Sequence, residues 1–286
     1  MRTLLFLALL LIVCNDAHAK LNFSTIKDYA ELSNGTYLND EALGQILEEK
    51  QRQLVHQATF TNSQVSFYLS SNDDIQTIAI RGTANLENVM LNLNLALQTD
   101  TTLAISLHQG FASAARAVYQ EVQPFLAPDM PISTTGHSLG GAIAVILAMY
   151  LEQDGYDLQQ VITFGQPKVT NVSGAKKFIA LPLLRVVTPE DIVPLVPPIS
   201  PLQITNLDIF WHMGDEIILQ GKNQYALTTG IKSMLRATKF GSSIPSEKNL
   251  IAHKMMTYLA KLNELQQESQ EVTYKTDINV FGFTLD

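Results

Sequence analysis

The pentapeptide Gly136-His137-Ser138-Leu139-Gly140 constrains the fold of this chain more than any other segment. It follows an apolar run that ends at Thr135 and precedes an Ala-rich run that continues to about Gln153, which predicts a strand, a sharp turn and a helix. The outer glycines let the turn hold Ser138 in a strained conformation, because a Cβ at either position would collide with neighbouring backbone. We therefore expect the Ser138 hydroxyl to project from a sheet edge beside the free N–H groups of the helix.

Hydrophobic periodicity on both sides of this turn predicts strands that alternate with helices. The expected strands occupy 65–69, 75–80, 132–135, 161–164 and 184–188, and the expected helices lie within 26–53 and at about 110–126, 139–153 and 249–266. This alternation predicts a mostly parallel sheet with helices on both faces. A Pro-rich segment after Pro194 leads into an expected hairpin over 208–220. No repeat and no long linker divides the sequence, so we expect a single domain.

A serine nucleophile imposes a further requirement on the rest of the chain. The serine hydroxyl is not deprotonated at neutral pH, so Ser138 needs an imidazole as base and a carboxylate that orients this imidazole. The strand–turn–helix element is typical of α/β-hydrolases, in which the order along the chain is serine, acid and then histidine. The partners of Ser138 are therefore expected downstream of it.

Few downstream residues fit these two roles. Asp191 follows the expected strand 184–188, and a loop at the carboxyl end of that strand would lie beside the serine. Glu190 is the nearest competitor, and a surface position without catalytic function is the alternative for Asp191. The histidines that follow are His212 and His253.

Several segments resemble the class 3 lipase family, which comprises fungal-type triacylglycerol lipases and their bacterial and plant relatives. In chain order these segments are Ile80-Arg81-Gly82-Thr83, His108-Gln109-Gly110-Phe111, Thr135 to Ala142, Thr163 to Val169, Arg185 to Pro194 and Phe210 to Glu216. They lie between about Tyr29 and Leu259, and the set is far more specific than any one of its members. The resemblance implies an α/β-hydrolase fold.

The same resemblance implies a role for each candidate residue. Asp191 lies in a segment similar to the family's Asp-x-Val-Pro element, and His253 matches the family's C-terminal catalytic histidine. His212 matches a histidine that usually supports a hairpin. We therefore expect Ser138, Asp191 and His253 to form a catalytic triad.

The segment around Arg81-Gly82-Thr83 resembles the strand end that supplies an oxyanion donor in this family. The resemblance implies that Thr83 and the N–H group of Leu139 form the oxyanion hole, and that the segment 84–97 is a lid. The chain departs from the family pattern at Val89 and Asn92, where Trp and Asp are common. Two interpretations of the segment 84–97 therefore stay open. It is either a lid that gives interfacial activation or a buried strand with leucines at every second position.

Composition excludes several other classes of protein. The formal net charge is −8 and no Lys/Arg run is present, so we expect no nucleic-acid partner. Cys14 is the only cysteine, which leaves no disulfide framework and no second thiol for a metal site. No metal and no organic cofactor is implied.

The N-terminus resembles a secretory signal peptide. Arg2 precedes an apolar run from Leu4 to Val13, which is too short to span a bilayer. The small-x-small triplet Ala17-His18-Ala19 then predicts cleavage before Lys20. We expect residues 1–19 to be removed and residues 20–286 to form one secreted α/β-hydrolase domain. A buried N-terminal helix and a lipoprotein anchored at Cys14 are the alternatives.

Together these features predict a secreted serine lipase or carboxylesterase whose partner is a lipid or another ester. A phospholipase A1, a galactolipid esterase and a feruloyl esterase use the same triad, so the sequence does not separate them. A catalytically silent lipid-binding module on the same fold is the alternative from another class. The complete set of Ser138, Asp191, His253 and Thr83 argues against it.

Overall fold

The computed structural model describes residues 21–61, 63–82, 96–198, 208–228 and 246–275, together with the backbone of 278–280 and 283–285. The expected signal peptide, Thr83 and nearly all of the expected lid lie outside the described residues. Within the described part of the chain, no helix is long and apolar enough to cross a membrane.

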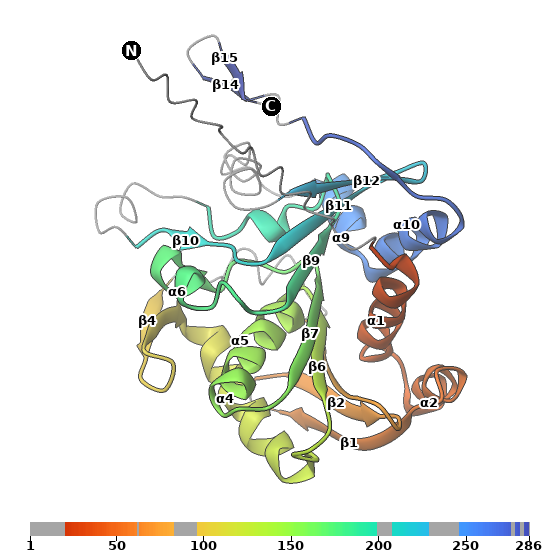
Figure 1. Cartoon of the computed structure of the whole chain (residues 1–286), viewed down its shortest axis with the longest axis vertical. Helices are drawn as coiled ribbons and strands as arrows, with labels where there is room; N and C mark the ends of the chain where they lie inside the picture. The colour runs from red at the N-terminus through yellow and green to blue at the C-terminus, as the bar shows by residue number, and fades with distance from the viewer. Residues whose placement is uncertain are drawn as a thin grey trace, which may run out of the picture.

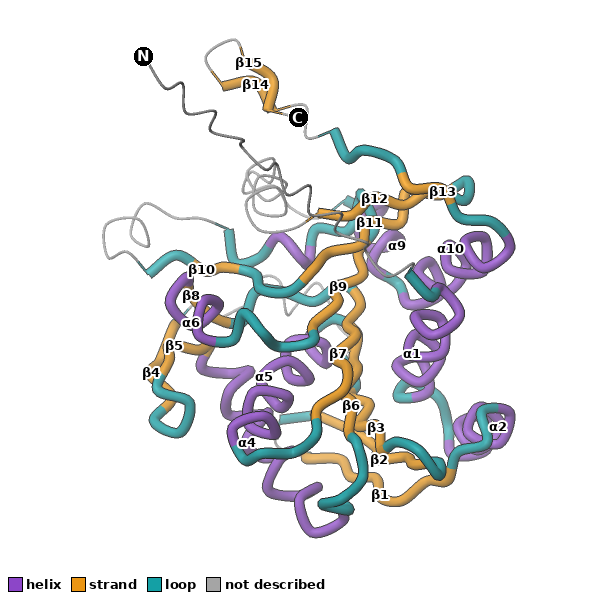
Figure 2. The backbone as a smooth tube through the Cα atoms, viewed as in Figure 1, coloured by secondary structure: helices purple, strands orange, loops and turns teal. Residues whose placement is uncertain are grey.

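A nine-stranded sheet forms the centre of the molecule, with the strand order β1-β2-β3-β6-β7-β9-β11-β12-β13 (Figures 1 and 2). The strands are β1 (Gln53–Phe60), β2 (Val65–Ser71), β3 (Gln76–Ile80), β6 (Ile132–His137), β7 (Leu158–Phe164), β9 (Leu183–Val187), β11 (Asp215–Gly221), β12 (Gln224–Thr228) and β13 (Gln270–Glu271). The pairs from β3 through β11 are all parallel, whereas β1, β2 and β12 join as antiparallel neighbours. The mostly parallel sheet expected from the sequence is confirmed.

Helices cover both faces of this sheet (Figure 2). One face packs against α4 (Gln109–Val122) and α5 (Leu139–Gln153), and the other against α1 (Phe23–Gly35) and α10 (Met255–Gln267). Every residue of α5 from Gly140 to Leu151 is buried, as expected for a helix that is apolar all round. The short helix α2 (Asp40–Glu49) packs beside α1 and β1.

A second, smaller sheet has the order β10-β8-β5-β4 and lies beside helix α6 (Val172–Lys177). Its strands are β4 (Leu97–Asp100), β5 (Ile105–His108), β8 (Thr170–Asn171) and β10 (Phe210–Trp211). The remaining elements are the 3-10 turns η1 (Gln123–Phe125) and η2 (Val193–Leu195), helix α9 (Glu247–His253) and the strand pair β14 (Ile278–Val280) and β15 (Phe283–Leu285).

The hairpin expected over 208–220 is shifted in the structure. Phe210 and Trp211 pair with β8 in the small sheet, and the hairpin is formed instead by β11 and β12. Gly214 separates the two, with a φ of 69°. A Cβ at this position would lie 2.4 Å from the Leu183 carbonyl oxygen, so glycine lets the chain pass close to β9 as it enters the central sheet.

The last expected helix is divided into two. Lys254 has an extended conformation, with φ −64° and ψ 137°, and it ends α9 at His253 before α10 begins at Met255. Neither glycine nor proline marks this break in the sequence. The break makes His253 the last residue of a helix, which leaves its carbonyl group without an intrahelical partner.

The turn between β6 and α5 brings three backbone segments into close contact. A Cβ at Gly136 would lie 2.4 Å from the Gly140 carbonyl, and a Cβ at Gly140 would lie 2.1 Å from the carbonyl oxygen of Ile80 in β3. Real Cβ atoms do not approach backbone so closely, and none of these backbone atoms is free to shift. The two glycines therefore allow α5 to start directly against the end of β3.

Replacing Gly140 by alanine should consequently disrupt the packing of α5 on the sheet. We expect Gly140→Ala to lower the free energy of unfolding by about 3 kcal/mol or more. Gly44 is the matched control, because it is exposed in α2 and an added Cβ meets nothing within 4 Å. Gly44→Ala should raise stability by about 0.5–1 kcal/mol. Urea unfolding of the two variants measures both effects, and equal small effects would contradict the close approach.

Candidate active site

Ser138 occupies the turn between β6 and α5 in a strained conformation. Its φ is 58° and its ψ is −128°, which is uncommon for a residue with a side chain. The Ser138 N–H donates to the Phe164 carbonyl at 2.9 Å, which ties the turn to the end of β7. Ser138 is 1% exposed. The expected serine turn at the edge of the sheet is therefore present.

Asp191 and His253 form a buried hydrogen-bonded pair. His253 Nδ1 lies 2.8 Å from Asp191 Oδ2, which also accepts a bond of 2.5 Å from the Tyr258 hydroxyl. The other carboxylate oxygen accepts from the Val193 N–H at 2.9 Å. Burial alone would raise the pKa of Asp191, but the charge of His253 and these hydrogen bonds outweigh it and hold this pKa below its usual range. The carboxylate is therefore ionised and acts as an acceptor.

Gly165 connects this pair to the serine turn. It directly follows Phe164, the residue whose carbonyl binds the Ser138 N–H, and it has a φ of 59°. A Cβ at Gly165 would lie 2.8 Å from Asp191 Oδ2 and 2.9 Å from His253 Cε1. The ends of β6, β7 and β9 thus bring the serine turn and the Asp–His pair to the same edge of the sheet, where open α/β sheets bind ligands.

The proton positions within the pair follow from the partners. An ionised carboxylate can only accept, so His253 Nδ1 carries a hydrogen, and Nε2 has a lone pair available to accept a proton whenever the ring is neutral. Within the part of the chain that the structure describes, His253 Nε2 and Ser138 Oγ are both buried and neither has a hydrogen-bond partner. Catalytic hydrogen bonds of this kind are often long without substrate and shorten in the reacting complex.

A second histidine, His137, joins the serine turn to the main chain of His253. His137 Nε2 lies 2.7 Å from the His253 carbonyl oxygen, and His137 Nδ1 lies 2.8 Å from the Tyr37 hydroxyl. The Tyr37 oxygen in turn accepts from the Gly82 N–H at 3.2 Å. Burial, followed by the charge of His253, lowers the pKa of His137 to about 3, and burial raises the pKa of Tyr37 to about 12. Both side chains are therefore neutral.

The other candidates from the sequence lie outside the Asp–His contact. The Glu190 carboxylate is 3.2 Å from the Lys248 ammonium, and the Glu190 carbonyl accepts from Asn249 at 2.8 Å. His212 Nε2 lies 2.6 Å from the Pro194 carbonyl oxygen, in the loop that follows Asp191. Leu139 is the first residue of α5, where a backbone N–H has no intrahelical acceptor.

Sequence patterns did not indicate Tyr37, His137, Gly165 or Tyr258 as site residues. His137 and Gly165 lie within the quoted motifs, but their contacts join segments far apart in the chain. Tyr258 fits the apolar face of the last helix, and a hydroxyl is the only sign that it could donate to a buried carboxylate. Nothing in the sequence near Tyr37 predicts its contact with His137.

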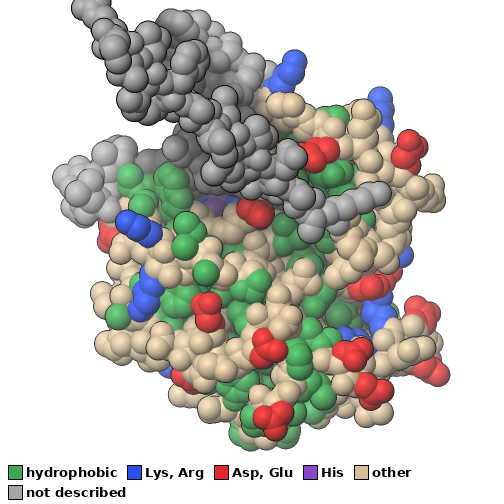
Figure 3. Space-filling model, viewed as in Figure 1, with side chains coloured by type: hydrophobic (Ala, Val, Ile, Leu, Met, Phe, Trp, Pro, Cys, Tyr) green, Lys and Arg blue, Asp and Glu red, His purple; other side chains and the backbone are tan. Residues whose placement is uncertain are grey.

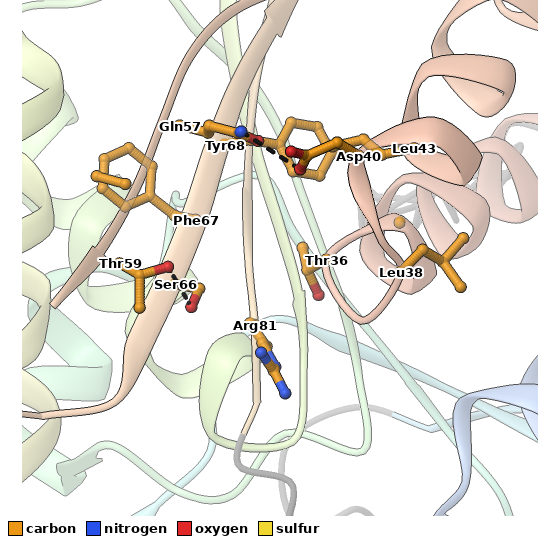
Figure 4. Close-up of a pocket in the computed structure, with 12 residues that line it drawn as sticks. Thr36, Leu38, Asp40, Leu43, Gln57, Thr59, Ser66, Phe67, Tyr68 and Arg81 are labelled. Carbon is orange, nitrogen blue, oxygen red and sulfur yellow. Dashed lines mark hydrogen bonds between the residues drawn. The ribbon is translucent and has the colours of Figure 1, made fainter. Parts of the chain in front are cut away.

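A surface pocket of about 310 Å³ lies between the α1–α2 turn, β1 and β2 (Figure 4). Its lining contains none of the triad candidates. The Thr59 and Ser66 hydroxyls are hydrogen-bonded on one side of it, and Asp40 accepts from Gln57 farther along. Arg81 extends from the end of β3 at the opposite end from Asp40, with its guanidinium 5.7 Å from the centre of the Tyr37 ring. Arg81 thus lines the pocket and also contacts Tyr37, the hydrogen-bond partner of His137.

The described residues include no cluster of three or more His, Cys, Asp or Glu side chains that could hold a metal ion. Charged groups are scattered over the molecular face seen in Figure 3, with Asp and Glu interspersed among apolar side chains.

The fold is that of an α/β-hydrolase, with the serine turn and the Asp191–His253 pair at one edge of its sheet. Residues 77–200 match the family described as lipase (class 3), so the resemblance found in the sequence motifs is confirmed. The matched region contains Ser138 and Asp191 and ends before His253.

Known relatives and solved structures agree with this assignment. The chain is 33% identical over 132 residues to the secreted mono- and diacylglycerol lipase 1 of Fusarium solani, which covers 43% of this chain and 39% of that protein. The structure of this chain is similar to that of the Lip2 lipase of Yarrowia lipolytica. The TM-score is 0.59 and the identity is 25%, over 69% of this chain and 80% of the Lip2 chain. Lipase II of Rhizopus niveus gives a TM-score of 0.59 at 24% identity, over 70% and 81% of the two chains, and shows the same fold.

The alignments to curated relatives are partial. They span 39%, 41% and 37% of three lipases from Fusarium solani, Gibberella zeae and Rhizomucor miehei. The chain thus matches about two fifths of the length of each of these relatives.

The depressed pKa of His137 makes a prediction about acid stability. The unfolded chain takes up a proton at His137 near pH 6.5, whereas the folded chain does so only near pH 3. The stability that neutral His137 contributes is therefore complete above about pH 6.5 and is lost as the pH falls toward 3, by up to about 1.4 kcal/mol per pH unit. Urea unfolding of the wild type and His137→Gln between pH 4 and 8 should show a shallower pH dependence for the variant. Parallel curves would contradict the assigned pKa.

Proposed function

We propose that this protein is a carboxylic ester hydrolase that acts on lipid esters through Ser138, His253 and Asp191. The observation that carries the proposal is the orientation of His253. Its Nδ1–H binds the buried Asp191 carboxylate, which leaves Nε2 as a free acceptor at the same sheet edge as the strained serine turn. This is the arrangement that a serine nucleophile requires.

The reaction follows from these groups. His253 Nε2 accepts the Ser138 proton while Oγ attacks the acyl carbonyl, and Asp191 stabilises the imidazolium that forms. The negative oxygen of the intermediate is held by the N–H of Leu139 at the start of α5 and by Thr83, the role that the family resemblance assigns to it. His253 then protonates the departing alcohol as its bond to the acyl carbon breaks, which leaves the acyl group on Ser138 Oγ. A water molecule that gives a proton to His253 next attacks this acyl group, and His253 returns the proton to Oγ as the acid leaves.

A lipid ester is the substrate class that we propose. Residues 77–200 match the lipase (class 3) family, and several relatives are named lipases or mono- and diacylglycerol lipases. Secretion is part of the proposal, supported by the signal-like N-terminus and by two relatives whose names include the word secreted. Residues 20–286 would then form the mature single domain.

Substitution of the nucleophile tests the reaction. We expect Ser138→Ala to lower kcat for p-nitrophenyl esters by more than about a thousandfold, because an alanine side chain cannot attack the acyl carbonyl. Ser113→Ala is the matched control, since Ser113 is exposed on α4, and it should leave kcat unchanged. Equal and negligible rates for wild type and Ser138→Ala would refute the proposal and favour a silent lipid-binding module.

The substrate class is tested with the same proteins. Rates are compared on p-nitrophenyl esters of increasing chain length, emulsified mono-, di- and triacylglycerols, and phosphatidylcholine vesicles. Preference for acylglycerols over phosphatidylcholine supports the lipase assignment. Preference for phosphatidylcholine would replace it with a phospholipase, and activity confined to short soluble esters would replace it with a simple esterase.

A further inference from the structure

We propose that His137 is a positioning residue that fixes His253 relative to the nucleophile. It does so as the centre of a hydrogen-bonded brace, which we define as the Gly82 N–H, the Tyr37 hydroxyl, the His137 ring and the His253 carbonyl. This inference rests on the proposed function, because it assigns His253 as the base. It concerns how the base is held and is independent of which ester is hydrolysed.

The donors and acceptors of the brace have only one consistent arrangement. The His253 carbonyl can only accept, so His137 Nε2, at 2.7 Å, must carry a hydrogen. Nδ1 of the neutral ring is then an acceptor, and the Tyr37 hydroxyl, at 2.8 Å, must donate to it. The Tyr37 oxygen remains free to accept from the Gly82 N–H at 3.2 Å. The tautomer of His137 is therefore fixed by its partners.

The brace connects three parts of the catalytic machinery. His137 immediately precedes the nucleophile, and Gly82 immediately precedes Thr83, the residue proposed for the oxyanion hole. The far end is the main chain of His253, which is 116 residues away from His137 in sequence. The two imidazole rings lie 4.5 Å apart between centroids and are tilted by 34°. A displacement at either end would therefore change the distance between base and nucleophile.

The His253 carbonyl is free for this contact because of the helix break at Lys254. At the end of α9, a carbonyl group has no following N–H to bind within the helix. The preceding carbonyl, of Ala252, accepts from the Thr188 hydroxyl at 3.2 Å. Side chains from the ends of β6 and β9 thus hold the two last carbonyl groups of α9, and the one from β6 is next to Ser138.

Neutral His137 suits this role in the reaction. Its low pKa keeps it uncharged when His253 becomes an imidazolium, so the two rings do not repel each other. Tyr37 is held in turn by the Arg81 guanidinium, which lies over its ring on the side of the pocket. The brace therefore has a further contact at Tyr37, in addition to the hydrogen bonds at its two ends.

Three substitutions separate positioning from simple packing. His137→Phe keeps an aromatic ring of similar size but removes both hydrogen bonds. His137→Gln places its amide nitrogen near the position of Nε2 and keeps the donor to the His253 carbonyl. Tyr37→Phe removes only the hydroxyl in the middle of the brace. His56→Phe is the matched control, because His56 stacks on Phe125 away from the site.

Kinetics on a soluble p-nitrophenyl ester provide the first readout. We expect His137→Phe to lower kcat by about ten- to a hundredfold with KM changed less than about threefold, since a displacement of about 1 Å has effects of this size. His137→Gln should recover most of kcat, Tyr37→Phe should be intermediate, and His56→Phe should equal the wild type. A folded His137→Phe with wild-type kcat, or a Gln variant as slow as the Phe variant, would overturn the brace.

Proton NMR provides a second readout that needs no ester. The His253 Nδ1–H bonded to Asp191 should give a downfield resonance that Asp191→Asn abolishes. His137→Phe should shift or broaden this resonance, and His137→Gln should restore it. An unchanged resonance in His137→Phe would overturn the brace even if the ester substrate were wrong, whereas an inactive wild type with the expected resonances would overturn only the proposed function.

Discussion

The contact between the start of α5 and the end of β3 is the constraint on which the site depends. Glycine at positions 136 and 140 removes the side chains that would separate these backbones, and the chain between them can then adopt the positive φ at Ser138. Strain at a single serine is tolerated because α5 is buried along nearly its whole length and cannot shift to relieve it. The packing of the core therefore holds the Ser138 hydroxyl in place.

Two buried polar side chains beside the serine turn, Asp191 and His137, are compensated by specific partners. Asp191 has three donors around its carboxylate, and burial of this charge would be costly without them. His137 is compensated differently, because it is buried as a neutral ring with one donor and one acceptor on opposite sides. The same low-polarity surroundings thus contain a charged Asp191 and a neutral His137. The number of hydrogen-bond donors around each side chain decides whether it is charged.

Much of this architecture could be predicted from the sequence. The parts that could not be predicted have one physical cause in common. The serine turn and the alternation of strands and helices are local patterns, and the structure shows both. It also places Asp191 against His253, the two residues selected by chain order and family resemblance. The helix break at Lys254, the strand partner of Phe210 and the contact of Tyr37 with His137 all depend on distant segments, so no local pattern predicts them.

The long sequence separation within the brace has a consequence for folding. Tyr37, His137 and His253 come from the first, middle and last parts of the chain, and α1 packs against α10 across this distance. Contacts between remote segments form late and slowly, because the intervening chain must lose its entropy first. Catalytic competence would therefore be the last property acquired during folding and the first lost when the C-terminal helices detach. Turnover of an ester by the proposed triad would thus report whether both ends of the chain have docked on the sheet.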